Sequence, residues 1–108
     1  MRLGIDIGST TIKLALIDEQ GTLLYKRYER HMSDVTGKMR EMLMEFERHF
    51  GGEFQVTMTG SGGLSLAKTL GIPFEQEVIA CSAAVQELIP QTDVLIELGG
   101  EDAKITFY

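Results

Sequence analysis

Two short polar turns divide the first thirty residues into three runs with the composition of β-strands. The runs cover residues 3–7, 11–18 and 22–30, and the turns lie at residues 9–10 and 19–21. In the first run apolar side chains recur at every second position, which is typical of a strand with one buried face. Turns this short connect antiparallel neighbours. The sequence therefore begins with a predicted three-stranded antiparallel meander, which is incompatible with a purely helical fold.

The apolar period then changes to that of an α-helix between residues 35 and 50. Apolar side chains are separated there by 4, 3, 1, 3 and 4 positions, at Val35, Met39, Met42, Leu43, Phe46 and Phe50. Ser33 or Asp34 is suited to cap the start of this helix, and Gly51 and Gly52 are suited to end it. The spacing predicts an amphipathic helix with one buried side.

Beyond residue 50 the sequence alternates short strands and helices. In chain order we expect a strand at residues 54–58, a glycine-rich loop at 59–63, a helix at 64–70, an extended piece at 74–78, a helix that runs to Ile89 before Pro90, and a hairpin of residues 94–98 and 103–108. Helical crossovers place strands parallel, whereas the meander supplies antiparallel ones. The prediction is an α/β fold with a mixed five-stranded sheet of order 3-2-1-4-5 and flanking helices. Its fifth strand is formed by residues 74–78 or replaced by residues 94–98.

Charge and composition argue against several classes of protein. The 108 residues carry 10 Lys+Arg against 16 Asp+Glu, a net charge of −6, whereas a nucleic-acid-binding protein normally shows a basic stripe. The single cysteine, Cys81, cannot form an internal disulfide, which favours a reducing compartment. The apolar runs are far shorter than a membrane span. We therefore expect a cytoplasmic protein that binds neither nucleic acid nor membrane.

The segment from Gly4 to Lys13 carries the strongest functional signal. Asp6 lies at the end of a predicted buried strand, where a carboxylate is costly unless positive charge compensates it. Glycine at position 8 lets the backbone approach a phosphate, and the turn that follows can direct N–H groups and hydroxyls at an anion. With Mg²⁺ at Asp6 and residual negative charge at Lys13, the segment would form a phosphoryl-transfer site. The alternative is a hairpin turn that Asp6 caps.

A second strand–turn–strand unit, at residues 97–104, has a similar plan. Glu97 comes shortly before the turn at Gly99 and Gly100, as Asp6 comes shortly before the first turn. The two units would face each other across the phosphates of a nucleotide. For the second unit alone, an ordinary hairpin with solvated charges is the alternative.

The remaining polar residues carry weaker signals. Gly60 and Ser61 precede a predicted helix, and because helix N-termini attract anions they are a third candidate phosphate contact, beside the alternative of a plain strand–helix loop. His31 and His49 lie among charged residues without metal-ligand spacing. Cys81 lies on a helix face of small residues and is expected to be buried rather than reactive.

Taken together, these residues resemble a known group of proteins. Residues 6–11, the meander, the helix, strand and loop that follow it, and the block Gly99-Gly100-Glu101-Asp102-Ala103-Lys104 are similar to the acetate/sugar kinase–chaperone–actin superfamily. Within it, the block resembles the ATP-dependent activators (activases) of 2-hydroxyacyl-CoA dehydratases and benzoyl-CoA reductases. The resemblance covers essentially the whole chain, and it implies a ribonuclease H-like, actin-like ATPase fold.

The residue roles implied by this resemblance centre on two carboxylates. Asp6 and Glu97 would be catalytic, and Asp6 would hold Mg²⁺. The β- and γ-phosphates of ATP would be contacted by Gly8, Ser9, Thr10, Thr11 and Lys13. The second phosphate loop would be formed with Glu97 by Gly99, Gly100, Asp102 and Lys104. Further nucleotide contacts would come from Gly60 and Ser61. Glu97 and Glu101 depart from the pattern, because smaller activators carry Asp and Gln there.

For a longer parent protein, the resemblance implies ATP hydrolysis coupled to electron transfer from a [4Fe–4S] cluster to a dehydratase or reductase partner. The family's cluster ligands and adenosine pocket follow the second phosphate loop. This chain is therefore expected to be an N-terminal fragment that holds no cluster, binds ATP weakly or not at all, and is inactive alone. Residues 1–90 would form the actin-like subdomain, and residues 91–108 would be the hairpin that opens the second. A small-molecule, sugar-type kinase and a nucleotide-gated assembly or chaperone-type protein are the alternatives.

The last hairpin also predicts association. A two-stranded hairpin alone is marginally stable in water, and its apolar side chains and unpaired edges favour further contacts. We expect it to fold back onto this domain's own sheet or helices, or to pair with the hairpin of a second copy in a homodimer.

Overall fold

The first three strands form the antiparallel meander that the turns predict. The structure is a computed structural model and describes residues 1–99 and 103–108. β1 (Arg2–Ile7) pairs with β2 (Thr11–Ile17), and β2 pairs with β3 (Leu23–Arg30), both antiparallel. One face of β1 and β2 is buried, through Leu3, Ile5, Ile7, Ile12, Leu14 and Leu16.

The strand that follows the first helix, β4 (Gln55–Thr59), returns parallel to β1. The helix is α1 (Val35–His49), and the side chain of Asp34 caps it by accepting a hydrogen bond of 3.1 Å from the backbone N–H of Gly37. A helical connection between β3 and β4 is what a parallel neighbour of β1 requires. The main sheet is therefore mixed, with the order β3-β2-β1-β4.

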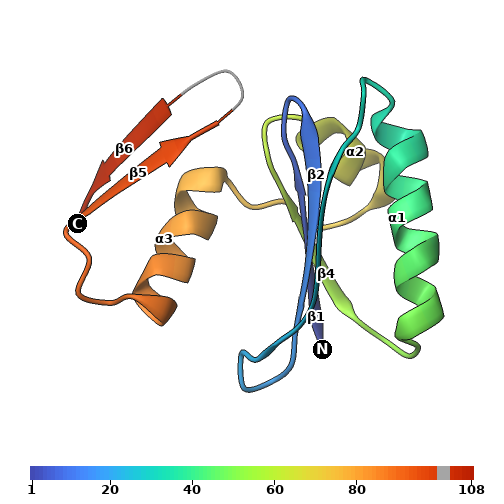
Figure 1. Ribbon diagram of the computed structural model, residues 1–108, viewed down its shortest axis with the longest axis horizontal. Coiled ribbons are helices and arrows are strands. Elements are labelled where there is room, and N and C mark those ends of the chain that lie inside the picture. Colours follow the sequence, from blue (N-terminus) through green and yellow to red (C-terminus); the bar gives the residue numbers. More distant parts are fainter. Residues whose placement is uncertain (100–102) are drawn as a thin grey trace.

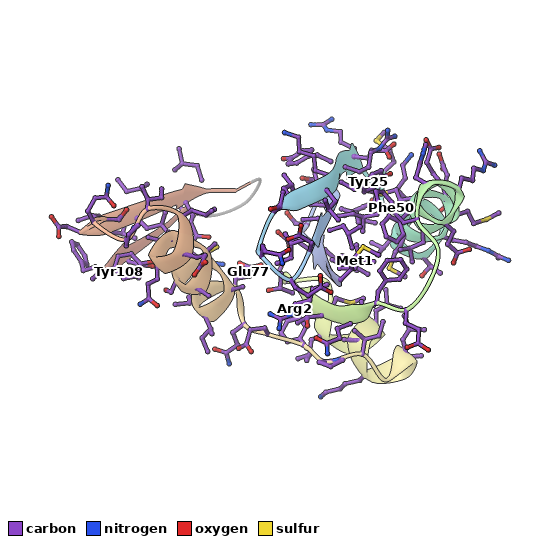
Figure 2. The ribbon with its side chains drawn as sticks, turned by 90° about the horizontal axis from the view of Figure 1, so that it is seen from below. Met1, Arg2, Tyr25, Phe50, Glu77 and Tyr108 are labelled. Carbon is purple, nitrogen blue, oxygen red and sulfur yellow. The ribbon has the colours of Figure 1, made fainter. Side chains whose placement is uncertain are left out.

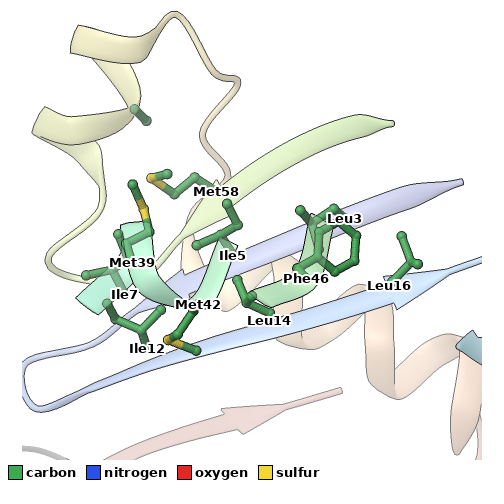
Figure 3. Packing of buried hydrophobic residues seen from close by; sticks show 11 residues of the cluster. Leu3, Ile5, Ile7, Ile12, Leu14, Leu16, Met39, Met42, Phe46 and Met58 are labelled. Carbon is green, nitrogen blue, oxygen red and sulfur yellow. The ribbon is translucent and has the colours of Figure 1, made fainter. Parts of the chain in front are cut away.

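The core lies between this sheet and α1, as Figure 3 shows. Met39, Met42 and Phe46 of the predicted apolar stripe are buried against it. The Tyr25 ring contacts Phe46 and Phe50, with ring centroids 5.3 and 5.6 Å apart (Figure 2). Each fully buried aliphatic side chain stabilises the fold by about 1.5–3 kcal/mol, so burial of this one face is the main source of stability.

The predicted five-stranded order is wrong, because the main sheet has four strands. Phe74 makes only an isolated parallel bridge with Met58. Two backbone hydrogen bonds hold it there, from Met58 N–H to the carbonyl of Pro73 and from Glu75 N–H to the carbonyl of Met58, both 2.8 Å. A helix begins at Glu77 and ends the extended stretch before a strand develops. Residues 94–98 do not replace the missing strand, because they pair in a separate two-stranded sheet.

The last helix and the terminal hairpin lie apart from this core. α2 (Leu64–Leu70) shares one side of the main sheet with α1, whereas α3 (Glu77–Leu88) lies on the other side together with the hairpin of β5 (Val94–Leu98) and β6 (Ala103–Phe107) (Figure 1). None of the helices in the described part of the chain is long and apolar enough to cross a membrane.

The hairpin packs one face against α3. Ser82 Oγ lies 3.2 Å from the hydroxyl of Tyr108, and Lys104 pairs with Glu77. The opposite face is apolar and exposed, and it consists of Val94, Ile96, Leu98, Ile105 and Phe107. The hairpin therefore folds back onto a helix of its own chain, and its outer face remains open to a further contact.

Candidate functional site

A cleft of about 650 Å³ separates the ends of the main sheet from α3 and the hairpin. The first strand–turn–strand unit lines it through Asp6, Gly8, Ser9, Thr10, Thr11 and Lys13. The second unit lines it through Glu97, Gly99 and Lys104, and Ser61 contributes from the loop after β4. The predicted contacts at Gly100 and Asp102 lie outside the described residues. The two units, whose carboxylates Asp6 and Glu97 are 91 positions apart in the sequence, thus lie around one space.

Within the first unit the register of the hairpin pairs the two charged candidates. Asp6 on β1 stands opposite Lys13 on β2, and Lys13 Nζ lies 3.4 Å from Asp6 Oδ2. The same ammonium lies 5.2 Å from the centroid of the Tyr28 ring, at a distance typical of a cation–π contact. Both partners are partly exposed, so the pair is accessible from the cleft and adds little to stability.

Close packing of two chain segments fixes the position of Asp6. The φ of Gly60 is 100°, and a Cβ at this residue would collide with the carbonyl oxygen of Ile7 and with Asp6 Oδ1. The backbone N–H of Gly62 donates to the same Ile7 carbonyl at 2.9 Å. Gly60 is not among the residues that line the cleft and lies against the end of β1 instead, whereas Ser61 faces the opening.

In the second unit Glu97 is held by the thiol of Cys81. Cys81 Sγ donates to Glu97 Oε1 at 2.8 Å. Glu97 Oε2 is buried and has no hydrogen-bond partner among the described residues. Burial, and then the hydrogen bond and negative charge of Glu97, raise the pKa of the Cys81 thiol to about 11. The raised pKa keeps the thiol protonated at neutral pH. The expectation that Cys81 is buried is met only in part, because the residue is half-buried and lines the cleft.

Glu77 is a charged residue of the cleft that the sequence reasoning missed. It lies in the first turn of α3, on the side that faces the main sheet (Figure 2), and its carboxylate accepts a hydrogen bond from Lys104. That bond holds the pKa of Glu77 below its ordinary value of 4.5. Both residues line the cleft. The sequence analysis placed Glu77 in an extended piece at residues 74–78. Because α3 begins at Glu77 instead, Glu77 stands four residues before Cys81 on the same helix face.

Other cleft residues come from segments without a recognisable motif. Tyr28 and Arg30 contribute from β3, and Thr59 contributes from the end of β4. Thr59 Oγ1, like Glu97 Oε2, is buried without a hydrogen-bond partner in the described part of the chain. Among the described residues, no group of three or more His, Cys, Asp and Glu side chains could hold a metal ion.

No family model matches this chain. It is 30% identical over 107 residues to an uncharacterised protein of Methanocaldococcus jannaschii, an alignment that covers 97% of this chain and 42% of that protein. The chain thus spans about two fifths of the length of the curated relative it matches.

Among solved structures, the chain is similar to component A of the (R)-2-hydroxyglutaryl-CoA dehydratase of Acidaminococcus fermentans, with a TM-score of 0.82 at 20% identity over 98% of this chain and 42% of that one. It is also similar to the activator of the 2-hydroxyisocaproyl-CoA dehydratase of Clostridium difficile, which was solved with bound ADPNP. That match has a TM-score of 0.76 at 21% identity and covers 98% of this chain and 40% of the other. The ethanolamine utilization protein EutJ of Carboxydothermus hydrogenoformans gives 0.69 at 19% identity, with 98% and 46% covered.

These likenesses identify the fold. The chain has the mixed α/β fold that these solved structures share, in agreement with the α/β class that the sequence predicts.

Proposed function

We propose that this chain is the N-terminal part of an ATP-dependent activator of an acyl-CoA dehydratase or reductase, and that its cleft holds the phosphates of Mg–ATP. The observation that carries the proposal is the meeting of two strand–turn–strand units at one cleft, each with a carboxylate next to a glycine turn. The chain is similar to two dehydratase activators over 98% of its length. This likeness favours an activator over a sugar-type kinase or an assembly or chaperone-type protein.

The first turn offers an anion unusually close access to the backbone. Gly8 does not have a positive φ, and a Cβ there would meet Thr11 only at 3.6 Å, an ordinary contact. Neither conformation nor packing in the chain therefore requires glycine at this position. Its use is to leave room for a ligand, while Lys13 supplies a positive charge on the same side.

The residues present fit a magnesium ion that is bound together with phosphate. Mg²⁺ commonly keeps several waters and takes one or two carboxylates plus phosphate oxygens, so a cage of three protein ligands is not needed. Asp6 would hold the ion, and the unpartnered Glu97 Oε2 would accept from one of its waters. When bound, the ion neutralises charge that develops on the transferred phosphoryl group.

The chain's own residues would act on the phosphates around that ion. The turn at residues 9–11 and Lys13 would bind phosphate oxygens, and Cys81 would keep the Glu97 carboxylate turned toward the cleft. In a longer parent, ATP hydrolysis would be coupled to electron transfer from a [4Fe–4S] cluster to the dehydratase or reductase. The chain has a single cysteine, so the cluster would be held by residues outside it.

The test is ATP hydrolysis by the longer protein with and without the Asp6 carboxylate. Asp6→Asn keeps the side-chain shape and removes the magnesium ligand, so we expect turnover to be abolished while circular dichroism is unchanged. Asp93→Asn is the matched control, because Asp93 is exposed and does not line the cleft. An activator hydrolyses ATP without an added hydroxyl acceptor, whereas a sugar-type kinase requires one. Wild-type turnover in Asp6→Asn would contradict the proposal.

A further inference from the structure

His31 lies directly behind the first turn of the cleft. It follows β3 and precedes α1, and only 6% of its surface is exposed. Both ring nitrogens have a neighbour on the backbone. Nε2 lies 3.1 Å from the carbonyl oxygen of Gly8, and Nδ1 lies 3.1 Å from the backbone nitrogen of Ser33.

These two contacts determine which ring nitrogen carries the proton. A backbone N–H can only donate, so Ser33 donates and Nδ1 accepts. The neutral ring then has its hydrogen on Nε2, which donates to the Gly8 carbonyl. The ring therefore connects the segment after β3 to the turn between β1 and β2.

The backbone around His31 is built to present the ring in this way. Met32 and Ser33 have φ of 51° and 63°, a left-handed conformation that residues with side chains adopt at a cost. This turn brings the Ser33 N–H back to the ring, and the N–H of Asp34 donates to the His31 carbonyl at 2.8 Å. The N–H of His31 itself donates to the Thr10 carbonyl at 3.1 Å.

Holding the Gly8 carbonyl also orients the next N–H group. In a trans peptide the C=O and N–H bonds point in opposite directions, and no cis peptide occurs among the described residues. Because the Gly8 carbonyl is turned toward His31, the N–H of Ser9 in the same peptide unit is turned away from it. Ser9 lines the cleft and His31 does not, so this donor is available to an anion there.

We infer that His31 is a positioning residue that holds residues 8–11 in the conformation that binds phosphate. The inference rests on the proposed function, because it assigns to the buried ring the task of presenting the first phosphate loop. The ring does not line the cleft, and it acts on the turn only through the Gly8 carbonyl.

Two substitutions separate the two ring contacts. His31→Asn keeps an acceptor for Ser33 N–H, in the geometry of an Asx-turn, but its amide is too short to reach Gly8. His31→Gln places an amide N–H near the position of Nε2 and loses the acceptor for Ser33. His49→Gln is the control, because His49 is the other histidine of the chain and is exposed on α1.

The experiment follows the backbone amides of the ¹⁵N-labelled chain during titration with Mg–ATP, and it also records the ring nitrogens of the two histidines. We expect His31 to be the Nε2–H tautomer. We expect His31→Asn to weaken Mg–ATP binding about tenfold, a free-energy change equal to that of about one hydrogen bond. Its midpoint of thermal unfolding should also fall, because the Gly8 carbonyl loses its donor. His31→Gln should bind more tightly than His31→Asn even if its midpoint of unfolding is lower.

The outcomes distinguish the two claims. If Mg–ATP shifts none of the amides of residues 8–11 in the unmodified chain, the positioning role is wrong for this chain, whereas the proposed function stands or falls with ATP hydrolysis by the longer protein. If the unmodified chain binds and His31→Asn binds equally well, only the positioning role is wrong. A ring with its proton on Nδ1 would also overturn the inference, and this measurement does not depend on any variant.

Discussion

Replacement of Gly60 tests how tightly the first part of the site is built. A Cβ at this position would collide with the Ile7 carbonyl oxygen and with Asp6 Oδ1, and its φ of 100° is one that L side chains rarely adopt. Gly52 has the same φ of 100°, but none of the described residues comes within 4 Å of a Cβ added there. The two glycines therefore separate the cost of the backbone conformation from the cost of the collision.

The expected magnitudes follow from this difference. Gly52→Ala introduces only a side chain in a left-handed conformation, which costs about 1–2 kcal/mol. Gly60→Ala adds overpacking between the ends of two paired strands, where forced shifts cost about 1–3 kcal/mol more. We therefore expect Gly60→Ala to lower the free energy of unfolding by about 2–5 kcal/mol, a large fraction of the total of about 5–15 kcal/mol for a domain.

The assay is urea unfolding of both variants and the wild type, followed by far-ultraviolet circular dichroism. The free energy of unfolding of Gly60→Ala should be clearly below that of Gly52→Ala. Equal losses in the two variants would show that the loop after β4 does not press on Asp6, and the account of how this carboxylate is positioned would be refuted.

Three further predictions concern the second unit and the hairpin. Because the pKa of Glu77 is lowered, its pairing with Lys104 stabilises the fold above pH 4.5, and this stabilisation is lost as the pH falls through the lowered pKa. Glu77→Gln should therefore reduce the midpoint of thermal unfolding at neutral pH and not in acid. An equal reduction at both pH values would contradict the pairing. The pKa of Cys81 is raised from 9.0 to about 11, so the fold should lose stability as the pH rises from 9 toward 11. At mildly alkaline pH, iodoacetamide should label Cys81 far more slowly in the folded chain than in the chain unfolded in urea. Equal labelling rates would refute the burial of the thiol. The outer face of the hairpin should associate with a second copy of the chain. The sedimentation coefficient should therefore rise with concentration in the wild type and not in Ile96→Lys, a substitution at a residue that is 62% exposed on this face. A wild type that is monomeric at every concentration would exclude the homodimer.

Local periodicity predicted the antiparallel meander and the first helix well, because both depend on residues that are close in the sequence. The meander and α1 follow from short turns and from a stripe of apolar residues. The fifth strand was wrong because pairing with β4 depends on where the chain goes after Pro73. Only a single bridge at Phe74 forms before α3 begins at Glu77.

The candidate site shows the same division between local and distant contacts. Asp6 and Lys13 were predictable as neighbours, because one hairpin turn sets their register. The contact between Cys81 and Glu97 joins a helix to a hairpin, and no local pattern specifies how those two elements pack. His31 was missed because its burial and its two backbone contacts arise from the left-handed turn at Met32 and Ser33, which no glycine marks in the sequence.

The measurement that tests the central claim most directly is a map of the amide resonances that respond when Mg–ATP is added to the unmodified chain. We expect weak, saturable binding in which the amides of residues 8–11 and of Gly99 in the second unit shift together. Amides of α1, on the other side of the sheet, should not shift. Removal of Mg²⁺ should weaken the response, because Asp6 would then face the phosphates without a compensating cation. Shifts confined to one of the two units, or centred away from the cleft, would contradict the claim that the two turns hold one nucleotide between them.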